Sequence, residues 1–92
     1  MSSVTVFLPG PLRQKVGNQP VLTVSGCTVR EVIDALDSAY PGLRFQLCYE
    51  SGELRPFVNI FLRRENIRYL QGLDTPVAPG EQVHIFPSVA GG

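Results

Sequence analysis

The sequence predicts a two-layer α+β domain, in which one helix covers one face of a mixed β-sheet of four to five strands. Alternating apolar residues, which are typical of half-buried strands, occur towards both ends of the chain, and one amphipathic helix lies between them. The 92 residues suffice for one modest core. We expect a domain over residues 1–87 and a flexible tail over residues 88–92.

Two strands are predicted at the start of the chain. Val4 to Leu8 alternates apolar residues on one face and ends at Pro9-Gly10-Pro11, and Val21 to Val24 forms the second apolar run. A hairpin is the simplest pairing of the two. We expect Leu12 and Val16, in the polar connection between them, to fold back onto the edge of the core.

The start of the helix is the best-marked boundary. Thr28 and Glu31 have the spacing of a capping box, in which each residue satisfies a backbone N–H at the helix start. Pro41-Gly42 ends the helix. Five apolar residues recur at helical spacing and are predicted to face the core: Val29, Val32, Ile33, Leu36 and Tyr40.

The second half of the chain contains the strongest strand pattern, Phe57 to Leu62, and a last strand, Gln82 to Phe86. Leu43 to Tyr49 fits either a strand or a short irregular segment packed under the helix. We expect Ile67 to Tyr69 to be a short return strand, and Gly72 to Gly80 to be a loop.

The sequence ends in Gly91-Gly92, after small residues that begin at Ser88. Five extended residues span about 16 Å, so the final carboxylate could reach into a cleft of another protein. Glycines lack a Cβ atom and would allow that cleft to be narrow. Chain ends are ordinarily mobile, however, so this ending does not define a site by itself.

Charge and composition exclude several classes of function. The formal net charge is zero and the charges are dispersed, so no nucleic-acid partner is expected. No apolar run approaches the roughly 20 residues of a membrane span, and no signal peptide is recognisable, so we expect a cytoplasmic protein without a membrane partner. The local basic cluster of Arg63, Arg64 and Arg68 is interpreted as a solvated hairpin tip rather than an anion or partner site.

The two cysteines and the single histidine do not form a metal-ligand set or a disulfide framework, so no metal is expected. We interpret Cys27 and Cys48 as reduced, structural side chains that are buried or half-buried. One alternative is a reactive thiol at Cys27, just before a helix N-terminus. Another is a Cys/His hydrolase with His84, for which the sequence offers no orienting third group or oxyanion loop.

The order of these elements, followed by Gly-Gly, resembles the ubiquitin-like β-grasp fold of the MoaD/ThiS family of sulfur carriers. Within that family it is most similar to the carriers of cysteine biosynthesis. Three stretches carry the resemblance: Arg55 to Phe61, Ile67 to Tyr69 and Gly80 to Gly92. The resemblance covers essentially the whole chain, although it is weak through Pro9 to Gln19.

The resemblance implies a carrier rather than an enzyme, with no cofactor bound to the chain itself. An E1-like adenylating enzyme would use ATP to activate the carboxylate of Gly92, sulfur would displace AMP, and the thiocarboxylate would donate sulfur to an acceptor enzyme. Val89, Ala90 and Gly91 would lie in the partner's cleft. The acceptor could be a cysteine synthase-like enzyme, the large subunit of molybdopterin synthase or a thiazole synthase. A ubiquitin-like protein modifier and a plain interaction module are the alternatives.

A β-grasp sheet also implies where a partner would dock. Its first and third strands flank the last, so Phe7, Phe61, His84 and Phe86 should be neighbours on the face away from the helix. Such a contiguous apolar patch is typical of an interface. The alternative is that isolated aromatic side chains only pair across strands.

Overall fold

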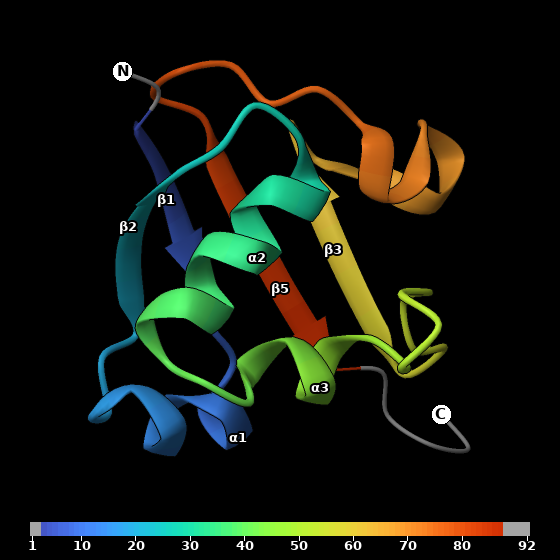
Figure 1. Ribbon diagram of the computed structural model, residues 1–92. Coiled ribbons are helices and arrows are strands. Elements are labelled where there is room, and N and C mark those ends of the chain that lie inside the picture. The colour runs from blue at the N-terminus through green and yellow to red at the C-terminus, as the bar shows by residue number, and fades with distance from the viewer. Residues whose placement is uncertain (1–2, 88–92) are drawn as a thin grey trace.

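The computed structural model describes residues 3–87, which form a five-stranded mixed sheet with helices packed on one side (Figure 1). The strands are β1 (Ser3–Phe7), β2 (Val21–Ser25), β3 (Val58–Leu62), β4 (Glu65–Asn66) and β5 (Gln82–Pro87). Their order is β2-β1-β5-β3-β4, and the β1–β5 pair is parallel while the other pairs are antiparallel. The α+β prediction and the β1–β2 hairpin are therefore confirmed.

The last strand, β5, occupies the centre of the sheet. Val83 pairs with Val6 on one side and with Leu62 on the other, and Ile85 pairs with Ile60. As expected, the first and third strands flank the last. The predicted tail, residues 88–92, lies outside the described residues, so its flexibility stays a prediction. The predicted tail therefore follows directly after the central strand of the sheet.

The main helix, α2 (Val29–Ala39), begins as the sequence predicts. Thr28 Oγ1 accepts a hydrogen bond from the backbone N–H of Glu31 at 3.2 Å. Glu31 Oε1 accepts in turn from the backbone N–H of Cys27 at 2.8 Å, one residue earlier than in the standard reciprocal bond. The backbone N–H of Val29 donates to the carbonyl of Thr75, so three backbone donors at this helix start are satisfied.

Two short helices, α1 (Gly10–Arg13) and α3 (Leu43–Leu47), accompany α2. A strand at Leu43 to Tyr49 is wrong, because Leu43 and Leu47, one helical turn apart, are both buried while Phe45 is exposed. The Oδ1 atom of Asp37 accepts hydrogen bonds from the backbone N–H groups of Gly42 and Arg44, and this stabilises the start of α3. The alternative, a short irregular segment packed under the main helix, is correct in its packing but not in its irregularity, because α3 is a regular helical turn in contact with α2.

The return strand lies two residues earlier than predicted. β4 comprises Glu65 and Asn66, whereas Ile67–Tyr69 is a 3₁₀ turn. The side chain of Asn66 accepts from the backbone N–H of Arg68 at 2.9 Å, which starts the turn and ends the strand. Further 3₁₀ turns lie at Gln14–Val16, in the connection after α1, and at Gly72–Asp74, within the predicted loop.

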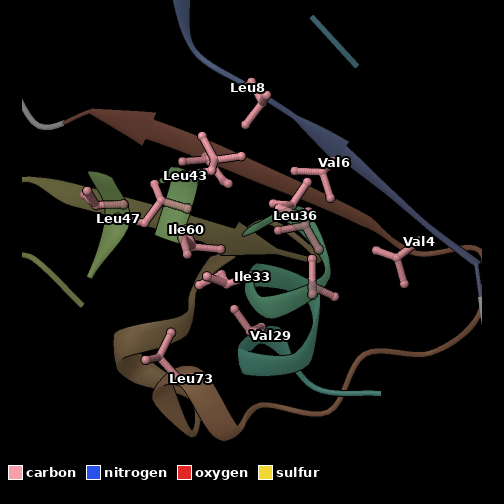
Figure 2. Close-up of a cluster of buried hydrophobic side chains, with 14 of the residues drawn as sticks. Val4, Val6, Leu8, Val29, Ile33, Leu36, Leu43, Leu47, Ile60 and Leu73 are labelled. Carbon is pink, nitrogen blue, oxygen red and sulfur yellow. The ribbon is translucent and has the colours of Figure 1, made fainter. Parts of the chain in front are cut away.

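The core lies between the sheet and the helices α2 and α3. Figure 2 shows Leu36 of α2 and Leu43 of α3 facing Val6 and Ile60 of the sheet. Val16 is also buried and Leu12 packs against the core, as expected. Among residues 3–87, no helix is both long and apolar enough to cross a membrane.

Candidate docking surface and carrier terminus

The face of the sheet opposite the helices carries one continuous row of side chains. The strand register aligns Val21, Phe7, His84, Phe61 and Asn66 as successive partners across all five strands. On β1, β3 and β5 these residues alternate with buried ones, so their side chains project away from the core. Phe86 lies one pleat further along β5, beside Asn59 of β3.

Phe7, Phe61, His84 and Phe86 form an aromatic cluster on this face. The Phe7 and His84 rings are stacked, with centroids 4.4 Å apart and planes 2° apart. His84 and Phe86 are nearly parallel at 6.1 Å, and Phe61 meets Phe86 edge-on at 5.7 Å. The structure thus brings these residues together away from the helix, as expected, while their role in docking stays a prediction.

Phe61, His84 and Phe86 of the aromatic cluster line one end of a shallow groove. The groove has a volume of about 670 Å³ and is continued by Arg63, Arg64, Glu81 and Gln82. Phe86 is 48% exposed, whereas Phe7, Phe61 and His84 are half-buried. One end of this surface is therefore aromatic and the other is polar and charged, which is a composition suited to recognition of a protein.

A tight turn between β3 and β4 forms the charged end. Leu62 pairs with Glu65, so Arg63 and Arg64 are the two central residues of the turn, with φ of 52° and 68°. The Arg63 guanidinium donates to Glu81 Oε1 at 2.6 Å, and this carboxylate also accepts from the backbone N–H of Ala78 at 2.7 Å. No side-chain hydrogen bond or ion pair within residues 3–87 holds Arg64, which leaves its charge available at the rim.

A hairpin tip is thus confirmed for Arg63 and Arg64 but is wrong for Arg68. The choice between a solvated tip and a partner site stays a prediction. The guanidinium of Arg68 donates to the backbone carbonyls of Arg55 and Val58, at 2.8 and 2.7 Å. It therefore stabilises the entry into β3 and does not contribute to the charged end of the groove.

The two cysteines occupy different environments. Cys48 is buried, and this burial raises the pKa of its thiol, whereas Cys27 is exposed. The expectation that both are buried or half-buried is wrong for Cys27, because it precedes the helix and its side chain does not reach the core. His84 stacks on Phe7 across the sheet, so the structure does not bring it together with Cys48. Within residues 3–87, no group of His, Cys, Asp and Glu side chains is arranged to hold a metal ion.

Gly92 and the adjoining Gly91, Ala90 and Val89 lie outside the described residues, so the structure does not place the predicted reactive end. It does place the strand that leads to it, since β5 ends at Pro87. Sequence reasoning missed the contribution of Arg64, Glu81 and Gln82 to the groove. The sequence predicted a hairpin tip here, but Arg63-Arg64 lacks the Asn-Gly type of signal for a tight two-residue turn, so the positive φ angles of both residues were not predicted.

Comparisons with known proteins give consistent results. The family model described as the ThiS family matches residues 6–92. The sulfur carrier protein CysO of Mycobacterium tuberculosis is 41% identical over 92 residues, which cover 98% of this chain and 99% of that protein.

Solved structures also match over nearly the whole length of this chain. The crystal structure of the Amycolatopsis orientalis BexX/CysO complex matches with a TM-score of 0.90 and 36% identity, covering 97% of this chain and 99% of that chain. The solution structure of small archaeal modifier protein 1 from Methanosarcina acetivorans matches with a TM-score of 0.85 and 34% identity, covering 100% of this chain and 98% of that chain. The β-grasp architecture is thus shared along almost the whole length.

Proposed function

Because this chain belongs to the ThiS family, we propose that it is a sulfur carrier protein that serves cysteine biosynthesis. The observation that carries the proposal is the 41% identity to a sulfur carrier protein CysO over nearly the full length of both chains. The relatives of this kind are named as carriers, so the chain is a co-substrate of enzymes rather than a catalyst. The aromatic cluster on the open face is then a docking surface.

The chemistry takes place at the carboxylate of Gly92, the last residue of the sequence. A carboxylate oxygen attacks the α-phosphorus of ATP, pyrophosphate leaves, and an acyl-adenylate results. A sulfur nucleophile at the oxidation level of hydrosulfide then attacks the carbonyl carbon, and AMP leaves with the carbon–oxygen bond electrons. The product is a thiocarboxylate. Glycine has no side chain to hinder either step.

The partner enzyme supplies ATP binding and catalysis, and this chain supplies recognition and reach. Residues 88–92 span about 16 Å when extended, so docking on the aromatic cluster would keep Gly92 within reach of a nearby adenylation site. The structure of a similar carrier in complex with BexX supports the idea that such chains act through partners. An acceptor enzyme, cysteine synthase-like for the proposed pathway, would then take the sulfur from the thiocarboxylate.

The proposal predicts complete dependence on the terminal glycine. After co-expression with the adenylating enzyme of the same organism, intact-mass analysis should show one oxygen replaced by sulfur. Deletion of Gly92, or addition of one residue after it, should abolish the replacement without changing the melting temperature. Ser88→Ala, which keeps the tail length, is the matched control. Normal thiocarboxylate formation by the chain that lacks Gly92 would falsify the proposal.

A second candidate function is protein modification through the same activated terminus. The likeness to small archaeal modifier protein 1, at 34% identity over the whole chain, favours it specifically. Mass spectrometry of cell extracts should then find a peptide that ends in Gly92 joined to a lysine side chain of another protein. Its absence from cells that accumulate the thiocarboxylate would leave sulfur transfer as the function.

A further inference from the structure

A second, smaller groove lies beside the end of β5. It has a volume of about 180 Å³, and of the nine described residues that line it only Gln46 has a polar side chain. Leu47 and Ile85 are buried core residues at its floor, while Phe57 and Phe86 are exposed at its rim. We call it the neck groove, because it flanks the point at which the predicted tail begins.

The neck groove adjoins the aromatic cluster at Phe86. Phe86 lines both this groove and the larger one on the open face. Phe57 is 60% exposed, although it is a large apolar side chain, in the turn immediately before β3. Contiguous exposed apolar surface of this kind typically marks an interaction site.

The size and composition of the neck groove define its occupant. Small-molecule sites usually have about 300–1,000 Å³ and several polar groups that orient the ligand. This groove is smaller and offers one polar side chain. A cavity of about 150 Å³ accepts a single benzene ring, so one apolar side chain of a protein is the occupant that fits.

The position of the groove indicates which protein supplies that side chain. The described chain ends at Pro87, and the five residues after it reach no further than about 16 Å. An enzyme that acts on Gly92 must therefore bring its surface close to the neck groove. We propose that this groove receives one leucine, methionine or phenylalanine side chain of the adenylating enzyme, an inference that rests on the proposed function.

Two substitutions test the proposal from opposite directions. Phe57→Ala removes one wall of the groove, and Gln46→Glu places a charge where the apolar side chain would be buried. Each should weaken binding to the adenylating enzyme about tenfold in titration calorimetry. Phe45→Ala, which removes an aromatic ring of 57% exposure outside the groove, and Gln71→Glu are the matched controls and should change the affinity less than about twofold.

Unchanged affinity in both groove variants would overturn the proposal. Two other outcomes would also overturn it, namely a dimer in sedimentation that Phe57→Ala dissociates, or methyl NMR signals of Leu47 and Ile85 that shift when residues 88–92 are deleted. These would assign the groove to a second copy or to the chain's own tail. With saturating enzyme, both variants should still form the thiocarboxylate, whereas failure of the unaltered chain to form it would count against the proposed function instead.

Discussion

The two faces of the sheet use the same strands for different purposes. On β5, Ile85 is 2% exposed under the helices, whereas the next residue, Phe86, is 48% exposed on the open face. On β3, Ile60 is buried and its neighbour Phe61 is half-buried within the aromatic cluster. Because successive residues of a strand point to opposite sides, stability and recognition can be altered separately by changing adjacent residues.

The largest expected effect lies on the covered face. Ile33→Ala and Leu36→Ala should each lower the free energy of unfolding by about 2–5 kcal/mol, because both side chains are buried between α2 and the sheet. Chemical denaturation measures this loss, and Ser38→Ala on the exposed side of α2 is the control. A loss below about 1 kcal/mol for both would mean that Ile33 and Leu36 are not the residues with which α2 covers the core.

Gly26 precedes α2 and packs closely against Glu31 and Val32 of that helix. A Cβ atom at this position would lie 2.9 Å from the backbone nitrogen of Val32, a contact that only a backbone shift relieves. Gly26→Ala should therefore cost about 1–3 kcal/mol of stability. Gly10→Ala, where a Cβ atom meets nothing within 4 Å, is the control. Equal denaturation midpoints for the two variants would contradict this prediction.

On the open face the expected effect is on binding rather than on folding. Phe61→Ala and Phe86→Ala should each weaken docking to the adenylating enzyme by about 1–2 kcal/mol, because each removes a ring of the aromatic cluster. Titration calorimetry measures the affinity and a melting curve measures the stability. Tyr69→Ala, which removes an exposed ring outside the cluster, is the control. Collapse of the fold in both variants would show that these rings belong to the core. The open face would then contribute to stability, as the covered face does.

The smallest expected effect concerns the helix cap. Thr28→Ala removes the acceptor for the backbone N–H of Glu31 and should cost about 1 kcal/mol. Thr28→Ser keeps that hydroxyl and should cost less. If chemical denaturation shows a larger loss of unfolding free energy for Thr28→Ala than for Leu36→Ala, the helix cap contributes more to stability than the buried side chain. The covered face would then not be the main source of stability.

Prediction from the sequence succeeded where a local pattern and the tertiary fold agree. The alternation of Val83, His84, Ile85 and Phe86 correctly assigned the two sides of β5, and the Thr28–Glu31 spacing correctly located the start of α2. It left Leu43 to Tyr49 open between a strand and a short irregular segment, because the apolar spacing there fits a strand and also one helical turn. It failed at Ile67 to Tyr69, where the Asn66 side chain ends the strand early.

The candidate site divides in the same way. The Gly91-Gly92 ending, the strand that leads to it and the identities of the four aromatic-cluster residues all follow from the sequence together with the resemblance that it carries. The neck groove could not be predicted, because residues from α1, α3, β3 and β5 meet there and no local pattern links them. The same is true of Glu81, whose pairing with Arg63 depends on an unusual backbone conformation at the β3–β4 turn.

By itself, the sequence determined where β1, β2, β3 and β5 lie, where the main helix begins and which side chains of these strands share a face, since these depend on hydrogen bonding and periodicity within a few residues. Only the tertiary structure decided that Phe7 stacks on His84, that Cys48 is buried while Cys27 is exposed, and that Phe57 and Phe86 border one groove. Those relations depend on the distances and angles at which separate elements pack, and residues far apart in the chain set them jointly.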